Sequence, residues 1–301
     1  MDLRQLEYFL AVAKRGSFTA AASELGLTQP SLTKTIRGLE QELGVQLFER
    51  LPRGVELTPF GSSLLRHAEA MHVHVQDAKN EIEGLRGGTF GLVTIGAGPA
   101  WLRRHLPVAV SRTLSRNPGI KVRIESGYDE GLIGLLRRGE VDFVVAELPT
   151  SERSKDLNVA PLTSDTLGVC CRAKHPLSKH RSVTMKRLLE FPWVMPPRSS
   201  RVQRRVTALF VAADLPAPEP AVEAESMAFL LQMLRDSDAL TYTIHTTLLS
   251  AEGADLTMLN VPQLRASRDA GIMSRRGAWL SPAANAIINE LKKICAGLPQ
   301  G

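Results

Sequence analysis

The pattern of hydrophobic and polar positions over residues 28–44 predicts a helix with two unlike faces. Four leucine or isoleucine side chains recur at steps of four, three and four, so they share one stripe of a 3.6-residue helix: Leu32, Ile36, Leu39 and Leu43. The opposite face carries short polar and cationic side chains, which suits a helix that lies in a DNA major groove. The expected DNA contacts on this helix are Thr28, Gln29, Pro30, Ser31, Thr33, Lys34 and Arg37.

The residues around this helix predict its limits and its neighbour. Thr28 suits an N-cap, and Pro30 lies in the first turn, where its missing N–H is not needed. Gly44 supplies a left-handed stop. Upstream, alanines at 20–22 let a second helix approach closely, and Gly26 allows the turn between the two helices. A small helical bundle with a solvated polar face is the alternative, but the agreement of these features favours a helix-turn-helix that recognises DNA.

A short hairpin is expected after Gly44. Residues 45–49 and 55–57 flank a Pro/Gly tip at 50–54, a pattern typical of the wing of a winged helix-turn-helix. Arg53 at such a tip is placed to enter the minor groove, and Arg50 to meet a phosphate. The alternative for both residues is that they are exposed loop arginines that are solvated and make no contact with DNA.

A long helix is expected from Pro59 to the Gly87–Gly88 pair. Its apolar positions follow a period of about 3.5 residues, which indicates a helix that pairs with another helix. A dimer formed in this way would present two recognition helices to a palindromic site. The alternative is a long helix packed on its own domain. The apolar positions are Phe60, Leu64, Ala68, Met71, Val75, Ala78, Ile82 and Leu85.

From residue 92 onward the pattern alternates between strands and helices, which predicts α/β subdomains with central sheets. Strands are expected at 92–96, 121–125, 141–147, 166–172, 193–195, near 223, and at 239–243, 256–261 and 269–275. Helices are expected at about 101–116, 129–138, 184–190, 200–213, 226–236, from 245, and at 282–296.

Several strand-to-helix turns of this region are expected to face one crevice, because ligands of such sheets bind beyond the carboxyl ends of strands and against helix N-termini. The crevice would hold a small molecule. The alternative for each serine is that it only caps its helix. The expected effector contacts are Gly98, Pro99, Ala100, Trp101, Ser126, Tyr128, Arg198, Ser199, Ser200, Arg201, Ser226 and Tyr242.

Composition and charge narrow the class of protein. The 301 residues are 44% hydrophobic and 23% charged, which is typical of two or three globular domains, and no apolar run is long enough for a membrane span. Residues 1–86 hold 10 Lys/Arg and 11 Asp/Glu, a net charge of −1, so the remaining residues carry a net charge of +7. That excess suits an anionic ligand, although a solvated basic surface explains it equally well.

The sequence offers no pattern for catalysis or for a cofactor. His67, His72 and His74 lie on the long helix without a completed ligand set, so surface histidines are expected and no metal. The odd cysteine count, with Cys170 beside Cys171, favours a reducing cytoplasm and packing thiols, with a redox sensor as the alternative. No nucleophile–base pair or phosphate loop is present, so an enzyme is not expected.

The N-terminal motifs closely resemble those of LysR-type transcriptional regulators. The residues that carry this resemblance are LRQLEYFLAVA at 3–13, GSFTAAA at 16–22, TQPSL at 28–32, LEQELG at 39–44, LFER at 47–50, RGVELT at 53–58 and Gly61. Residues 135–145, LLRRGEVDFVV, are similar to the family's first effector-binding subdomain. The remainder agrees in pattern only.

This resemblance implies a winged helix-turn-helix with a linker helix, followed by an α/β two-lobed effector domain like type 2 periplasmic binding proteins. It implies a dimer of dimers, with promoter DNA, a small effector and RNA polymerase as partners. The family often has Ser or Thr where this chain has Pro99-Ala100-Trp101. Trp101 adds an aromatic wall there, and Tyr128 lies in the next loop, so the two residues favour a flat or aromatic acidic effector. A transport or storage protein without a DNA function is the alternative. The expected domains are 1–58, 59–88, 89–163 with 267–301, and 164–266.

Overall fold

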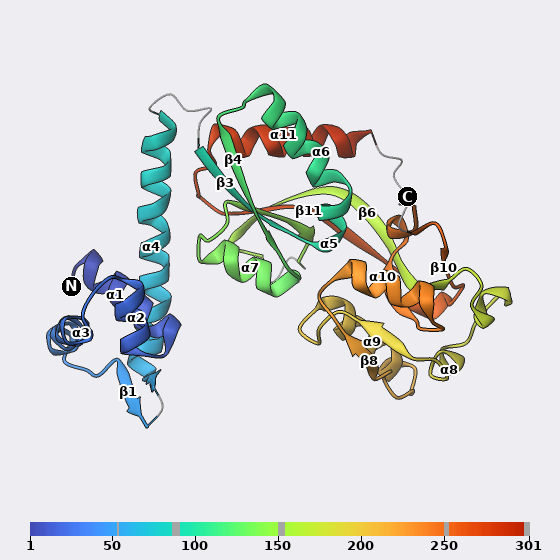
Figure 1. Ribbon diagram of the computed structural model, residues 1–301, viewed down its shortest axis with the longest axis horizontal. Helices are drawn as coiled ribbons and strands as arrows, with labels where there is room; N and C mark the ends of the chain where they lie inside the picture. Colours follow the sequence, from blue (N-terminus) through green and yellow to red (C-terminus); the bar gives the residue numbers. More distant parts are fainter. Residues whose placement is uncertain (53, 86–90, 150–153, 250–252, 298–301) are drawn as a thin grey trace. The chain divides into compact units, whose positions relative to one another are not determined.

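In the computed structural model the chain forms two compact units, Met1–Glu83 and Gly84–Gly301 (Figure 1). The structure describes all residues except 53, 86–90, 150–153, 250–252 and 298–301.

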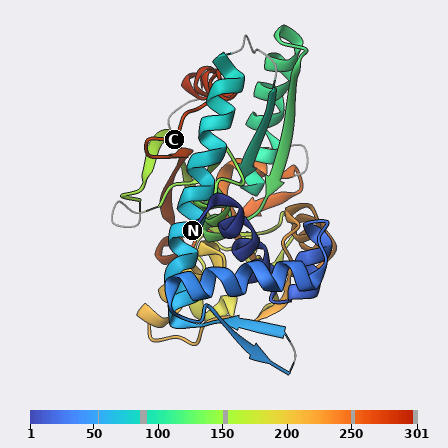
Figure 2. The same cartoon turned by 90° about the vertical axis from the view of Figure 1, so that its left-hand side faces the viewer.

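The first unit is a cluster of three helices, a hairpin and one long helix. Figure 2 shows α4 extending well beyond the three short helices and the hairpin. The buried residues Phe9, Val12, Ile36 and Leu39 form the centre of its core, to which Ala68 of the long helix adds. Its elements are α1 Leu3–Arg15, α2 Phe18–Glu24, α3 Gln29–Leu43, β1 Phe48–Leu51, β2 Gly54–Leu57 and α4 Pro59–Leu85.

The ends of the short helices follow local side-chain and glycine signals. Asp2 and Gln5 form a capping box at the start of α1, and Gly16 ends it in the left-handed conformation. Gly44, with φ 71°, ends α3 as predicted. Thr28 takes the N-cap position of α3, but its side chain makes no capping hydrogen bond. Leu43 was expected on the buried stripe and is 40% exposed, because it lies in the last turn, beyond the part of α3 that packs on α1 and α2.

The hairpin is fixed to the helices by backbone contacts. The N–H of Val55 donates to the carbonyl of Gly16 at 2.9 Å. At Gly54, φ is 100° and a Cβ would lie 2.6 Å from the Gly16 oxygen, so only glycine fits without strain. The Glu40 carboxylate of α3 accepts from the N–H of Leu47 at 2.8 Å, which holds the approach to the hairpin. The first strand begins at Phe48, three residues later than predicted.

The second unit contains two α/β lobes. In lobe I, parallel strands lie between helices on both faces, and β5 places its residues alternately on each. Phe143 and Val145 contact the cluster under α6 and α11, whereas Val144 and Ala146 contact the cluster under α7. The elements of lobe I are β3 Gly91–Ala97, α5 Pro99–Arg103, α6 His105–Arg116, β4 Ile120–Ser126, α7 Asp129–Arg137, β5 Phe143–Glu147 and α11 Pro282–Ala296.

Lobe II has its own two clusters of buried side chains. Phe210 of α9 packs edge-on against Trp193, with ring centroids 6.1 Å apart, on one side of the lobe. Leu231 of α10 lies in the other cluster, beside Val194. The elements of lobe II are η2 Pro176–Lys179, α8 Met185–Leu188, β7 Trp193–Met195, α9 Arg201–Ala212, β8 Pro220–Glu223, α10 Met227–Asp236, β9 Thr241–Ile244, η3 His245–Leu249, β10 Leu256–Met258 and η5 Pro262–Leu264.

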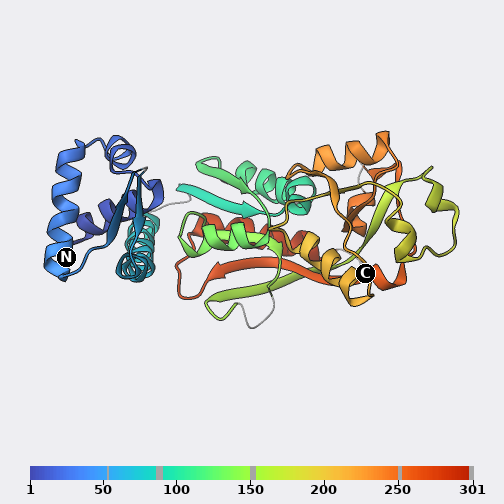
Figure 3. The same ribbon diagram turned by 90° about the horizontal axis from the view of Figure 1, so that it is seen from below.

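Two long strands run from one lobe into the other, β6 Leu157–Arg172 and β11 Ala266–Arg275 (Figures 1 and 3). They pair with each other along most of their length, and β6 then pairs with β9 and β10. Within the described residues the main sheet has the order β10-β6-β11-β5-β3-β4. The pairing register shifts between Ala270 and Gly271, opposite Pro161, which lacks a ladder N–H.

Several predicted boundaries in this unit were wrong. The helix expected at about 101–116 is two helices, because Arg104 leaves the helical conformation. The strand expected at 166–172 begins at Leu157, and the segment after Ile244 is a 3-10 helix. Smaller differences affect four other elements. The strands expected at 141–147 and 269–275 begin at Phe143 and Ala266, the helix expected at 184–190 spans Met185–Leu188, and the strand expected at 256–261 ends at Met258.

Candidate functional site: a recognition helix and an interlobe cavity

The polar face of α3 is open to solvent. Leu32, Ile36 and Leu39 are at most 1% exposed on the opposite side of the helix. The Gln29 amide donates to the Thr33 hydroxyl at 3.0 Å, so these two side chains are held together at the start of the helix. The arrangement presents hydrogen-bonding and cationic groups on a rigid element, which is what reading of base edges requires.

The structure places most of the predicted DNA contacts on this one face. Thr33 is half-buried, and the other predicted contacts on α3 and its N-cap are exposed: Thr28, Gln29, Pro30, Ser31, Lys34 and Arg37. Arg50 lies in β1, opposite Val55. Arg53 lies outside the described residues.

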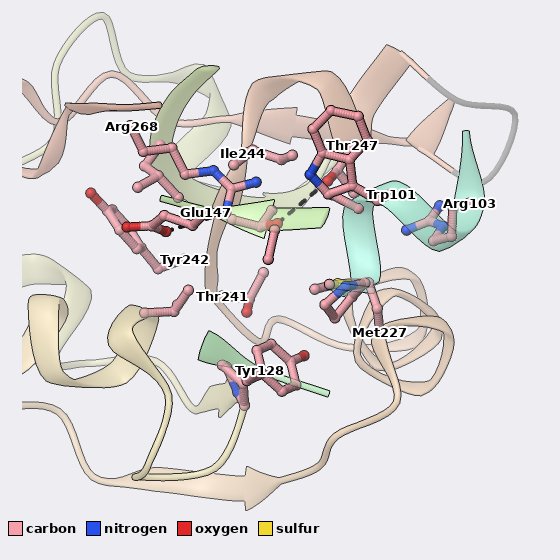
Figure 4. A pocket seen from close by; sticks show the side chains of 18 of the residues that line it. Trp101, Arg103, Tyr128, Glu147, Met227, Thr241, Tyr242, Ile244, Thr247 and Arg268 are labelled. Carbon is pink, nitrogen blue, oxygen red and sulfur yellow. Dashed lines mark hydrogen bonds and ion pairs between the residues drawn. The ribbon is translucent and has the colours of Figure 1, made fainter. Parts of the chain in front are cut away.

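The second candidate site is a cavity of about 50 Å³ between the two lobes. Lobe I contributes the turns that follow β3 and β4 and the end of β5, and lobe II contributes β9 and the start of α10. Figure 4 shows Arg268 and Glu147 next to each other on one side, with Trp101 and Arg103 on the other. The strand-to-helix turns therefore converge, as the parallel topology predicts.

A buried ion cluster lies in the wall of this cavity. Glu147 ends β5 with its side chain 5% exposed, and its two carboxylate oxygens accept from different arginines. Arg205 of α9 donates at 2.6 Å, and Arg268 of β11 donates at 3.2 Å. Burial raises the pKa of Glu147, but the hydrogen bond from Arg205 and the charge of Arg268 outweigh it, so the pKa is lowered overall. The carboxylate is therefore ionised and joins lobe I to lobe II.

Other polar contacts also join the lobes. The Tyr128 hydroxyl donates to the backbone carbonyl of Glu225 at 3.2 Å. Arg201 of α9 donates to the carbonyl of Leu148 at 3.0 Å, and Arg204 lies 3.5 Å from the carboxylate of Glu130. The residues 201, 204 and 205 share one face of α9, since side chains three and four apart are neighbours on a helix.

Half of the predicted effector contacts line the cavity: Gly98, Pro99, Ala100, Trp101, Tyr128 and Tyr242. Trp101 and Tyr242 are only 3% and 1% exposed, and both belong mainly to the lobe cores. Burial raises the pKa of Tyr242 to about 12, so its hydroxyl stays neutral.

The other predicted effector contacts have different surroundings. The Ser200 and Ser226 side chains cap α9 and α10, and Arg198 pairs with Glu223. Arg201 donates to the Glu147 and Leu148 carbonyls, whereas Ser126 and Ser199 are exposed; none of these six lines the cavity.

Sequence reasoning missed the charged and hydroxyl residues of the cavity: Arg103, Glu147, Thr241, Thr243, Thr247 and Arg268. A carboxylate at the end of the buried run 143–147 is a signal that could have identified Glu147. Arg268 gave no local signal, because it lies on β11, more than a hundred residues after Glu147 in the sequence, and meets Glu147 only in the folded structure.

The remaining reactive side chains do not form a site in the described part of the chain. Burial raises the pKa of Cys171 to about 12 and that of Cys170 further, which makes both thiols poor nucleophiles and favours the packing interpretation. His67, His72 and His74 are exposed. Among the described residues no cluster of His, Cys, Asp or Glu could hold a metal ion, and no helix is long and apolar enough to span a membrane.

Two family models match the chain. The model described as "Bacterial regulatory helix-turn-helix protein, lysR family" matches residues 3–62, and the one described as "LysR substrate binding domain" matches residues 86–296.

Characterised proteins and solved structures agree with these matches. The chain is 32% identical to the HTH-type transcriptional regulator PcaQ of Agrobacterium fabrum over 305 residues, which cover 100% of this chain and 97% of PcaQ. It is 33% identical to the HTH-type transcriptional regulator GbpR of Azospirillum brasilense, over 80% of this chain and 71% of GbpR. Full-length OxyR from Pseudomonas aeruginosa has the same fold, with a TM-score of 0.63 at 21% identity over 97% of this chain and 95% of OxyR. CbnR in complex with its target DNA gives a TM-score of 0.61 at 21% identity, over 97% of this chain and 99% of CbnR.

Proposed function

The chain belongs to the LysR-type family of transcriptional regulators, and on this premise we propose which residues recognise DNA and which bind the effector. It is a DNA-binding regulator with an N-terminal helix-turn-helix domain and a two-lobed effector-binding domain. Its relatives are regulators of transcription and not enzymes. The alternative of a transport or storage protein without a DNA function is excluded, because the helix-turn-helix family model matches residues 3–62, which contain the three short helices and the hairpin.

The polar face of α3 enters the major groove. Gln29 is the base-reading residue, Lys34 and Arg37 contact phosphates, and Arg50 and Arg53 act from the wing. The observation that carries this proposal is the separation of α3 into a fully buried apolar stripe and an exposed polar face.

The protein acts as a dimer through α4, and dimers pair into tetramers. Phe60 and Ile82 are each 58% exposed and Met71 is 41% exposed, although all three belong to the predicted apolar stripe. A stripe of this kind on a 27-residue helix suits a helix partner from a second copy.

A small anionic effector binds in the interlobe cavity and alters the spacing of the paired heads on DNA, which is a population shift between two arrangements. Two arginines, Arg205 and Arg268, surround the single carboxylate of Glu147, and this excess of positive charge favours an anionic ligand. Tyr128 provides an aromatic wall, but Trp101 lies mostly in the core, so the structure supports an acidic ligand more than an aromatic one.

Three further parts of the proposal follow from the family. The lobes divide as 89–163 with 267–301 and 164–266, which agrees with the way the hydrophobic clusters separate. The protein works in the cytoplasm, and RNA polymerase is its partner at the promoter.

DNase footprinting of the full-length protein on the DNA that flanks its own gene tests the proposal. We expect two protected half-sites whose separation is a multiple of about 10 base pairs. Organic acids that raise the melting temperature should change the length of the footprint. Absence of any specific protection, or an identical footprint and identical transcription with every stabilising acid, would contradict it.

A further inference from the structure

Arg268 lines the cavity and has a buried donor without an acceptor among the described residues. The inference rests on the proposed role of this cavity in effector binding. The Arg268 side chain is 12% exposed and comes from β11, one of the two strands shared by the lobes. One Nη donates to Glu147 at 3.2 Å. Its buried Nε–H has no acceptor among the described residues.

A buried guanidinium N–H without an acceptor is costly, since the group has lost water and gained nothing in return. Glu147 does not supply the second acceptor. Its other oxygen lies 2.6 Å from the Arg205 guanidinium, so the carboxylate is drawn toward α9. Of the two bonds to Glu147, the one from Arg268 is therefore the longer and the easier to exchange.

Asp165 on β6 is a second carboxylate near Arg268: the two residues lie opposite each other in the strand pair and both line a neighbouring cavity, but no hydrogen bond joins them among the described contacts. The Thr246 hydroxyl donates to Asp165 at 3.1 Å, and burial raises the pKa of Asp165. Asp165 thus has a hydrogen-bond donor of its own.

We infer that Arg268 is the anchor for a carboxylate group of the effector, and that the negative charge of Glu147 opposes the binding of that carboxylate. An incoming carboxylate accepts from the Nε–H and the Nη2–H of Arg268, the side-by-side geometry in which arginine binds carboxylates, whereas Glu147 accepts from Nη1. Glu147 keeps its shorter bond to Arg205, so the link between β5 and α9 persists.

The present cavity also limits the size of the ligand. Its volume of about 50 Å³ takes only a few water-sized groups, since one water needs roughly 10–15 Å³ by the same measure. Acetate is small enough to serve as a probe without opening of the lobes. Acetamide has the same shape and no charge.

The first test is the thermal stability of the full-length protein in acetate, in chloride at equal ionic strength and in acetamide. Acetate should raise the melting temperature to a plateau, and chloride and acetamide should not. R268K keeps the charge opposite Glu147 but loses the side-by-side geometry, so it should lose most of the response to acetate. The matched control is R198K, because Arg198 pairs with Glu223 outside the cavity and should respond like the wild type.

The second test requires a gain of affinity, which misfolding cannot imitate. E147Q removes the competing charge, so the acetate concentration at half-saturation should fall by roughly tenfold, about the effect of one charge-assisted hydrogen bond. An acetate response no larger than that to chloride, an R268K response equal to the wild type, or weaker acetate binding by E147Q would each overturn the inference. Gel shifts of the wild-type protein with promoter DNA separate this result from the proposed function, because specific DNA binding without any response to acetate would overturn the inference and leave the proposed recognition of DNA standing.

Discussion

At the scale of single residues, His175 is a fully buried titratable group in lobe II. Its Nδ1 accepts from the N–H of Leu177 at 3.0 Å, and its other ring nitrogen lies 3.1 Å from the carbonyl of Asp238. These contacts satisfy one neutral tautomer, with the proton on Nε2. The His175 ring also packs against the Phe191 ring, with the ring centroids 4.6 Å apart. Burial lowers the pKa of His175, although the bond to Asp238 works in the opposite direction.

The stability of the effector domain should therefore depend on pH through His175. Since the folded-state pKa is lowered, the unfolded chain binds more protons below about pH 6.5, and stability falls as the pH falls through that range. One such histidine contributes a slope of at most about 1.4 kcal/mol per pH unit. Urea unfolding of the wild type between pH 5 and 7.5 should show this loss, and H175Q should show a smaller slope. H67Q, which changes an exposed histidine of α4, is the control; equal slopes in H175Q and the wild type would contradict the prediction.

Single residues also show what the sequence could reveal about the cavity. Gly98 to Trp101 and Tyr128 were predicted because they follow strands, and parallel strands end at the same edge. Glu147 and Arg268 were missed because their meeting depends on β11 lying beside β5, a pairing between segments far apart in the sequence. Periodicity gives no information on such a pairing.

At the scale of elements, the wing depends on two glycines that meet. Gly16 and Gly54 both have positive φ, and the wing backbone passes within hydrogen-bond distance of the end of α1. The position of the wing relative to α3 is therefore set by backbone contact as well as by side-chain packing.

Gly54→Ala should destabilise the protein by roughly 1–3 kcal/mol and weaken promoter binding, because the new Cβ would meet the Gly16 oxygen at 2.6 Å. Gly38→Ala is the matched control. Gly38 lies inside α3 with no atom within 4 Å of a new Cβ, so this change should stabilise by up to about 1 kcal/mol. Urea unfolding followed by circular dichroism measures both, and a Gly54→Ala variant as stable as Gly38→Ala would refute the argument.

The elements that were predicted well are those with strong local signals, such as α3 between Thr28 and Gly44. The first half of β6 was missed because its polar residues and Pro161 do not resemble a strand. Its strand conformation comes from pairing with β11, where Gly271 leaves room for the carbonyl of Ala160. Tertiary contacts thus override local preference at that point.

At the scale of the whole molecule, the proposed dimer through α4 would present two recognition helices to DNA. Ile82→Glu places a charge in the exposed apolar stripe of α4, so we expect self-association to weaken by at least tenfold. Lys79→Glu, on the polar side of the same helix, should leave it nearly unchanged. Sedimentation equilibrium measures both variants, and a dimer of Ile82→Glu as tight as the wild type would rule out α4 as the interface.

Recognition of DNA by the polar face of α3 is tested most directly by binding of the full-length protein to promoter and scrambled DNA at several salt concentrations. Gln29→Ala should cost about 1–3 kcal/mol on the promoter and almost nothing on scrambled DNA. Lys34→Ala should weaken binding to both and reduce the salt slope by about 1. If both variants bind promoter DNA with wild-type affinity and salt dependence, α3 does not read the promoter.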